Sequence, residues 1–325
     1  MSKEQTNQSC PAFKTMCGGQ ALIEGIMMRG PKKQAAVVRR PDGELEIRQE
    51  ELKFIKDRHP IVGVPFIRGV FTFLDSMVNG VKNLMWSAEF YPDEDEQPEQ
   101  PSKFEQWLEK KLGNEKFYSL VITLAVVMGI GLSVVLFFLL PTLLGGVVAF
   151  ITPSMLARNV AESLLKVVIF LTYLALCSRM KDIRRVFQYH GAEHKTIFCY
   201  EAGLELTVEN VKMQPCHHPR CGTSFLFVVI IVSILVSTVV FHFWPIEHSL
   251  LRFLAHLVML PAIVAVSYEF NRWCGRHNNP LTRVLTAPGL WLQNFTTFEP
   301  DDGMIEVGIK ALELVLPEEK GEDAW

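Results

Sequence analysis

The sequence predicts a mainly α-helical, multi-pass membrane protein with about four transmembrane helices and a small α+β cytosolic portion that includes an N-terminal β-hairpin. Two observations carry this prediction. Residues 118–150 contain no charged side chain, and residues 223–244 form a second charge-free run. The composition, with 49% hydrophobic residues and a mean hydropathy of +0.19, would also suit a soluble protein. The prediction of membrane insertion therefore rests on the local apolar runs.

Residues 1–90 are expected to form the cytosolic N-terminal region. Residues 34–55 alternate partly between polar and apolar side chains around a Pro41-Asp42-Gly43 turn, which predicts the hairpin. Upstream, residues 17–31 combine glycines with Glu24 and Arg29, and they indicate a turn followed by a strand. Their spacing matches no phosphate-binding motif, so the pattern predicts no chemical function for this segment.

Residues 61–90 predict an amphipathic helix, because apolar side chains recur at helical spacing while Arg68, Asp75 and Lys82 fall seven apart on another face. Two placements remain open: on the bilayer surface, or packed against the hairpin. Residues 91–116 then form an acidic linker and a pre-membrane helix, since the linker is too charged and too poor in apolar residues to fold by itself.

The membrane domain is predicted at residues 117–270, with spans near 118–140, 160–180, 223–244 and 250–270. The first span is expected to end near Pro141, followed by an apolar loop or short re-entrant piece. In the second, Glu162 and Lys166 are expected to reach toward the interface. Pro261 is expected to kink the fourth span.

Positive charge predicts the orientation, because Lys and Arg are retained on the cytoplasmic side of short loops. Residues 181–222, a His-rich loop, and the C-terminal region 271–325 carry most of it. The loop after the first span has only Arg158, and residues 244–251 have no Lys or Arg. We therefore expect a cell-membrane protein with both termini and the His-rich loop in the cytosol.

Within the C-terminal region, residues 287–300 resemble a membrane-surface segment anchored by Trp291 and Phe295. Residues 301–316 show helical periodicity, with acidic residues at the start.

The charge and the cysteines bear on partners and compartment. A net charge of −3 argues against a broadly basic nucleic-acid surface, and no specific nucleic acid is predicted. Seven irregularly spaced cysteines suit reduced thiols better than a secreted disulfide framework. The polar N-terminus has no apolar segment typical of a cleaved signal peptide.

The segment with the strongest chemical signal is His190-Gly191-Ala192-Glu193-His194, an H-x-x-E-H arrangement. On a helix, residues four apart share a face, so both imidazoles could bind one divalent metal ion, for which the ligand types predict zinc, while Glu193 serves as general base. A third ligand is needed. Five nearby residues offer donors: Glu201, Cys216, His217, His218 and Cys221.

Two plainer interpretations compete with a catalytic metal site. Histidine and glutamate at a basic helix end are often capping or ion-pair groups. Alternatively, two cysteines and two histidines could close the coordination shell, and the site would then be structural, since catalytic zinc keeps an open position.

Four sequence blocks resemble the YqhQ family of bacterial membrane proteins over nearly the whole chain: GGQALIEGIMMRGP, YHGAEHKTIFCYEAG, HPRCGTSFL and PGLWLQNFTTFEPDDGMIEV. The resemblance implies a domain of unknown function with a predicted metal-dependent enzyme activity. Its pattern carries over to Gly18, Gly19, Gln20, Glu24, Gly25, Arg29, His190, Glu193, His194, Glu201, His218, Arg220, Cys221, Gln293, Thr297 and Glu299. Cys216 and His217 lie just outside the blocks.

The sequence is compatible with three classes of function. The leading hypothesis is a metal-dependent membrane hydrolase in which His190, His194 and one of Glu201, His218 or Cys221 bind the metal. The rival is a non-enzymatic scaffold or assembly factor that binds a cytosolic or membrane protein. A transporter is disfavoured, because the centres of the first and third spans lack ionisable groups, although His256 and Glu269 lie in the fourth.

Overall fold

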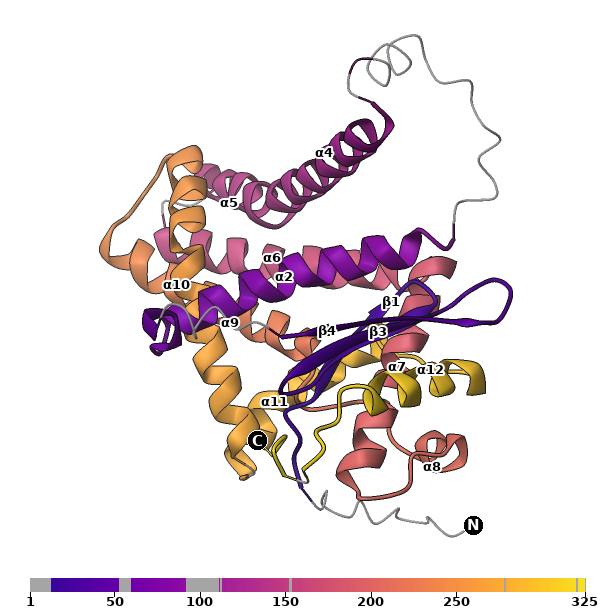
Figure 1. Ribbon diagram of the computed structural model, residues 1–325. Coiled ribbons are helices and arrows are strands. Elements are labelled where there is room, and N and C mark those ends of the chain that lie inside the picture. Colours follow the sequence, from indigo (N-terminus) through magenta and orange to yellow (C-terminus); the bar gives the residue numbers. More distant parts are fainter. Residues whose placement is uncertain are drawn as a thin grey trace, which may run out of the picture. The chain divides into compact units, whose positions relative to one another are not determined.

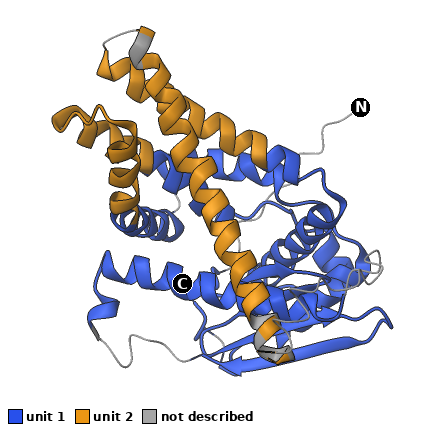
Figure 2. Cartoon of the chain, turned by 90° about the horizontal axis from the view of Figure 1, so that it is seen from above, with its two compact units in different colours: residues 1–91, 174–232, 261–325 blue, residues 92–173, 233–260 orange. Residues whose placement is uncertain are grey.

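The computed structural model describes residues 13–52, 60–91, 111, 113–151, 154–277, 279–319 and 321–324. These residues divide into two compact units, each built from separate stretches of the chain (Figure 2). Unit 1 comprises residues 1–91, 174–232 and 261–325, and unit 2 comprises residues 92–173 and 233–260. The predicted linker and pre-membrane helix at 91–116 lie mostly outside the described residues.

Unit 1 contains a four-stranded antiparallel sheet in the order β1 (Gly18–Leu22), β2 (Gly25–Arg29), β3 (Lys33–Arg39) and β4 (Leu45–Glu51). The predicted hairpin is the β3–β4 pair, in which Arg39 lies opposite Leu45 around the predicted turn. Its last residues, 53–55, are outside the described part. The segment at 17–31 is more than a turn and a strand: it forms β1 and β2, which meet at a two-residue turn where Glu24 has a φ of 49°.

The two faces of the sheet bury different residues, as strand alternation requires. Ile26, Met28, Ala35 and Val37 lie in one core with α7 (Lys181–Glu201) and α12 (Asp302–Glu313), which cover that face (Figure 1). Leu22, Met27, Ala36 and Val38 form the other core, against Trp86 at the end of α2 (Ile67–Ala88). Both faces are therefore covered, which explains why β2 and β3 are apolar on both sides.

Helix α2 confirms the predicted amphipathic helix and follows the short helix η1 (Pro60–Gly63). Its buried residues are small or polar, namely Gly69, Gly80, Asn83 and Ser87. Gly80 lies against Gln20 of β1, and Ser87 Oγ accepts a hydrogen bond from Ile23 N–H at 3.2 Å. The helix thus packs against the sheet, one of the two placements expected from the sequence, and its apolar face is left exposed, with Val78 at 67% and Leu74 at 51%.

Four helices or helical runs are long and apolar enough to cross a membrane: Leu120–Val148, Met155–Cys177, Gly222–Phe243 and Ser249–Arg276. The last three are α6, α9 and α10. This number agrees with the four predicted spans. Pro261 lies inside α10, and the kink expected there stays a prediction.

The first span differs from its prediction, because the helix does not end at Pro141. Helix α4 (Asn114–Val134) continues through a π-helical turn, η2 (Val135–Leu139), into α5 (Leu140–Ile151). A π turn already interrupts the regular hydrogen-bond ladder, so a proline without an N–H fits directly after it at little cost. The expected apolar loop after Pro141 is therefore helical.

The remaining described elements of unit 1 are α8 (Val208–Lys212), α11 (Pro280–Leu292) and η3 (Gln293–Phe295). Helix α11 begins with a capping box made by Asn279 and Thr282, and α12 begins at Asp301, whose side chain accepts a hydrogen bond from Met304 N–H at 2.8 Å. These caps fix where α11 and α12 begin. The helical periodicity predicted at 301–316 corresponds to α12.

Candidate metal centre

Helix α7 carries the H-x-x-E-H residues at its centre. Its first turns are mostly exposed and basic, whereas most of the residues from Tyr189 to Glu201 are buried under the sheet and α12. The predicted His-rich loop at 181–222 is therefore helical over its first half. His190 and His194, four residues apart, lie on one face of α7, and their ring centroids are 4.4 Å apart.

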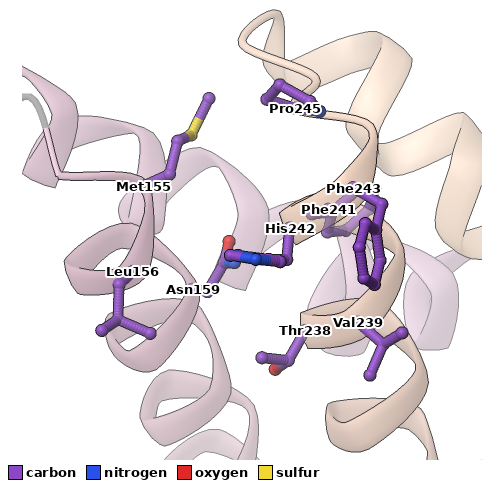
Figure 3. Close-up of a pocket in the computed structure, with 9 residues that line it drawn as sticks. All are labelled: Met155, Leu156, Asn159, Thr238, Val239, Phe241, His242, Phe243 and Pro245. Atoms are coloured by element: carbon purple, nitrogen blue, oxygen red, sulfur yellow. The ribbon is translucent and has the colours of Figure 1, made fainter.

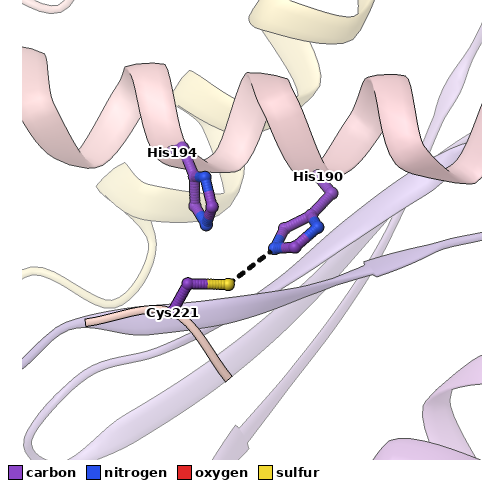
Figure 4. A group of neighbouring side chains, drawn as sticks. All are labelled: His190, His194 and Cys221. Atoms are coloured by element: carbon purple, nitrogen blue, oxygen red, sulfur yellow. Dashed lines mark hydrogen bonds between the residues drawn. The ribbon is translucent and has the colours of Figure 1, made fainter. Parts of the chain in front are cut away.

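Cys221 completes a group of three possible metal donors. Ligand atoms of His190, His194 and Cys221 all lie within 4.8 Å of one another. His190 Nε2 is 3.1 Å from Cys221 Sγ, as the dashed line in Figure 4 shows. Cys221 reaches the histidines because it stands at the start of α9, directly before Gly222. We call these three residues the donor set.

Both imidazoles are held in the same tautomer by backbone carbonyls. His190 Nδ1 donates to Thr296 O at 2.8 Å, and His194 Nδ1 donates to Cys216 O at 2.5 Å. A carbonyl oxygen only accepts, so each Nδ1 carries a proton, and Nε2 is the nitrogen of each ring that can serve as a ligand once it is deprotonated. His194 Nε2 is buried and has no hydrogen-bond partner among the described residues.

The thiol of Cys221 lies in surroundings that favour the thiolate. Burial alone would raise its pKa, but the neighbouring His190 and His194 outweigh burial and hold the pKa well below its usual value. Thr223 adds to this, because its N–H donates to Cys221 Sγ at 3.4 Å in the first turn of α9. Burial would likewise lower the pKa of His190, but the charge and hydrogen bond of Cys221 raise it to about 9.

Glu193 lies beside the donor set without belonging to it. Its Oε1 accepts a hydrogen bond from Gly19 N–H of β1 at 2.9 Å, and its buried Oε2 has no partner within the described chain. Burial raises the pKa of Glu193, against the opposing charges of His190 and His194. A carboxylate with one oxygen fixed and the other free is suited to take up a proton.

Two of the residues predicted as alternative ligands, Glu201 and His218, form a separate pair. Glu201 is fully buried, forms an ion pair with Arg220, and accepts a hydrogen bond from Thr15 N–H at 2.8 Å. His218 Nε2 lies 3.6 Å from Glu201 Oε2, while its Nδ1 accepts a hydrogen bond from Arg220 N–H. Of the three residues proposed for the third ligand position, only Cys221 therefore joins the two histidines.

The other candidate donors, Cys216 and His217, contribute no side-chain ligand to the donor set. Cys216 contributes its carbonyl to His194, and its Sγ lies 3.4 Å from Glu299 Oε1. His217 is partly exposed. Their position just outside the sequence blocks of the resemblance agrees with this arrangement.

Gln293 braces the loop that carries Cys221, a role that spacing in the sequence did not indicate. Its Oε1 accepts a hydrogen bond from His218 N–H at 2.8 Å, and its Nε2 donates to His218 O at 2.8 Å and to Ser224 Oγ at 3.1 Å. Thr297 Oγ1 in turn donates to Gln293 O at 2.8 Å. Only the resemblance to a known family had marked Gly19, Gln293 and Thr297, because their contacts join segments far apart in the chain.

The chemistry of the donor set fits zinc. Neutral imidazole nitrogens and a thiolate are ligands that zinc prefers, and three protein ligands leave one coordination position open. The carbonyls of Thr296 and Cys216 provide the outer contacts that usually orient metal-bound histidines. The buried, unpartnered Nε2 of His194 would gain its missing partner from a bound ion.

Comparison with known proteins agrees with the resemblance found in the sequence blocks. The family model described as "Protein of unknown function (DUF1385)" matches residues 64–318. "Uncharacterized protein YqhQ" of Bacillus subtilis (strain 168) is 35% identical over 303 residues, which cover 92% of each chain. No solved structure matches.

Proposed function

Because the chain belongs to the DUF1385 family, whose description gives no activity, we propose one from its side chains: a metal-dependent hydrolase of the membrane. In this proposal His190, His194 and Cys221 hold a zinc ion, and Glu193 is the general base. The observation that supports it most is the donor set itself, three ligand atoms within 4.8 Å of one another beside a buried carboxylate.

The proposed reaction assigns a task to each side chain. A zinc ion in the donor set would supply a Lewis acid that polarises a substrate carbonyl or phosphoryl group and makes water more acidic. Glu193 takes the proton from the attacking water on its free Oε2 and passes it to the leaving group. Gly19 N–H holds Oε1, so Oε2 is the oxygen that remains free to accept the proton.

Metal content tests the donor set directly. Full-length protein purified in detergent is expected to contain about one equivalent of zinc, and His190→Ala and Cys221→Ser are expected to lose it. His217→Ala is the matched control, since it removes an imidazole from the same loop but from outside the donor set. Metal-free wild-type protein, or equal loss in the control, would overturn the proposal.

The variant Glu193→Gln tests two questions. Its zinc content shows whether Glu193 is a base or a metal ligand, and its complementation shows whether the protein acts as an enzyme or as a scaffold. A base does not bind the metal, so the variant should retain zinc. It should fail to complement a strain that lacks the gene, although it is present in the membrane at the wild-type level. Loss of zinc in Glu193→Gln would make Glu193 a ligand. Full complementation with zinc retained would favour the rival function, a scaffold that binds a protein partner.

We further propose that the donor set faces the cytosol of a cell-membrane protein whose two termini are also inside. The support is the distribution of positive charge, which is concentrated in residues 181–222 and 271–283. A C-terminal green fluorescent protein should therefore fluoresce, and a C-terminal alkaline phosphatase should be inactive. The opposite pair of results would reverse the orientation.

A further inference from the structure

Unit 2 contains a buried cluster of charged and polar side chains, away from the donor set. Its members come from three helices: Thr142 on α5, Arg158, Asn159, Glu162 and Lys166 on α6, and Arg252 and His256 on α10. We call it the Glu162 cluster. Arg252 and His256 are each 1% exposed, Glu162 is 2% exposed and Arg158 is 3% exposed. The sequence had suggested that Glu162 and Lys166 reach toward the interface, but both are buried within the unit.

Glu162 occupies the centre of the cluster and has both oxygens engaged. Oε1 accepts hydrogen bonds from Thr142 Oγ1 at 2.8 Å and from His256 Nε2 at 2.6 Å, with Lys166 Nζ at 3.5 Å. Oε2 accepts a hydrogen bond from Arg252 Nε at 2.7 Å. The carboxylate therefore has no capacity left to neutralise a further cation.

Positive charge exceeds negative charge in this cluster. Three cationic side chains, Arg158, Lys166 and Arg252, stand against the single carboxylate of Glu162. Arg158 contacts no carboxylate among the described residues: it donates to Glu247 O at 2.7 Å and to Ser249 Oγ at 3.2 Å. Even with Lys166 uncharged, one positive charge is in excess.

Two buried guanidinium groups also have unused donors. Arg158 Nε and Arg252 Nη1 have no hydrogen-bond partner in the part of the chain that is described. The charges of Arg158 and Arg252 repel each other. An unbalanced charge in a membrane-spanning segment is costly, and an anion between such groups would remove much of that cost.

A pocket of about 370 Å³ adjoins the cluster between α6 and α9 (Figure 3). Its walls are largely apolar, with Leu156, Val239 and Phe243 among the lining residues. Asn159 belongs to both the pocket and the cluster, because its Oδ1 accepts a hydrogen bond from Arg252. Its amide N–H groups are thus left to donate to an occupant.

We propose that unit 2 binds an anionic phospholipid, with its phosphate balanced by Arg158 and Arg252 through the Asn159 edge and part of an acyl chain in the pocket. The apolar walls favour an amphiphile over a free anion, and the excess positive charge favours a lipid with net negative charge. This inference concerns unit 2 alone and does not depend on the proposed hydrolase.

Thermal unfolding of the full-length protein in neutral detergent tests the proposal with three additives. Phosphatidylglycerol is expected to raise the unfolding temperature in a saturable way, and phosphatidylcholine and inorganic phosphate are expected to have little effect. Equal effects of the two lipids would show that charge plays no part and would overturn the proposal. A comparable effect of inorganic phosphate would mean a free-anion site and would also overturn it.

Single substitutions test whether the lipid binds at the proposed site. Arg158→Gln is expected to weaken the apparent affinity for phosphatidylglycerol about tenfold, the effect of losing one charge-assisted contact. Val239→Trp fills the pocket from a position that is 55% exposed, and should abolish the lipid effect without removing a charge. Arg179→Gln is the charge-matched control at an exposed position and should behave as wild type. Unchanged lipid stabilisation in both Arg158→Gln and Val239→Trp would exclude this site.

Discussion

At the scale of single residues, the candidate centre depends on close contacts between the sheet and α7. Gly19 makes one of them. A Cβ at this position would lie 2.5 Å from Met27 O and 3.1 Å from Glu193 Cδ. The backbone of β1 can therefore approach the proposed base only because residue 19 has no side chain.

Gly19→Ala is expected to destabilise the protein by about 2 kcal/mol, because backbone atoms of two strands must move apart. A fall of several degrees in the unfolding temperature would measure it. Gly18→Ala is the matched control, since a Cβ there meets nothing within 4 Å. Equal stability of the two variants would contradict the close approach.

His218 predicts a pH dependence of stability. Burial lowers its pKa from 6.5 to about 4 in the folded protein, against the opposing hydrogen bond of Glu201. Below pH 6.5 the unfolded chain binds a proton that the folded protein does not bind, so stability falls between pH 6.5 and about 4, by roughly 3 kcal/mol at most. Thermal unfolding from pH 7 to 4.5 should show this fall in wild type and a flatter profile in His218→Gln. Parallel profiles would contradict it.

At the scale of elements, the sequence predicted what depends on local pattern. The long apolar runs, two of them free of charge, predicted four membrane-type helices, the alternation around Gly43 predicted the β3–β4 hairpin, and the spacing of His190 and His194 predicted that they share a face. Each of these rests on neighbours within a few residues.

The features of the fold and of the candidate site that the sequence did not predict depend on contacts that the local pattern of residues does not reveal. The continuation of the first span through Pro141 depends on the π turn before it. Among several nearby donors, Cys221 joins the histidines because Gln293, more than 70 residues later, holds its loop. The burial of Glu162 and Lys166 follows from Arg252 and His256 on another helix.

Helix α2 has the reverse of the usual arrangement for a helix packed on a sheet, because its small and polar residues are buried and its apolar face is exposed. We expect that face to contact lipid. A photoreactive amino acid at Val78, 67% exposed, should crosslink to phospholipid in native membranes. The same group at Met213, an exposed apolar position after α8, serves as control and should not. Crosslinks from Val78 to protein alone would contradict the lipid contact.

At the scale of the whole molecule, segments from opposite ends of the chain are joined. Thr15 forms a β-bridge with Ala324, Met16 N–H donates to Asp323 O at 2.6 Å, and Thr15 Oγ1 donates to Asp323 Oδ2 at 2.5 Å. Thr15 N–H also donates to Glu201, so this junction reaches the pair formed by Glu201 and Arg220.

Asp323→Ala is expected to cost about 2 kcal/mol, because it leaves the buried Thr15 hydroxyl without its acceptor. Glu322→Ala is the neighbouring control. It breaks only the ion pair with Lys32, whose side chain is 69% exposed, and should leave stability almost unchanged. Chemical unfolding of the two variants compares them, and similar losses would contradict the structural importance of the junction.

Unit 1 is built from three stretches of the chain that are separated by the stretches of unit 2, and this order matters during synthesis. The ribosome makes the sheet first, α7 and Cys221 next, and the Thr296 carbonyl that orients His190 much later, with α12 after it. In the proposed zinc site, the ion would therefore be held in its final geometry only after synthesis has passed all four apolar helices. On this proposal, a cell short of zinc would hold complete chains without the ion, and these chains could bind zinc later without new synthesis.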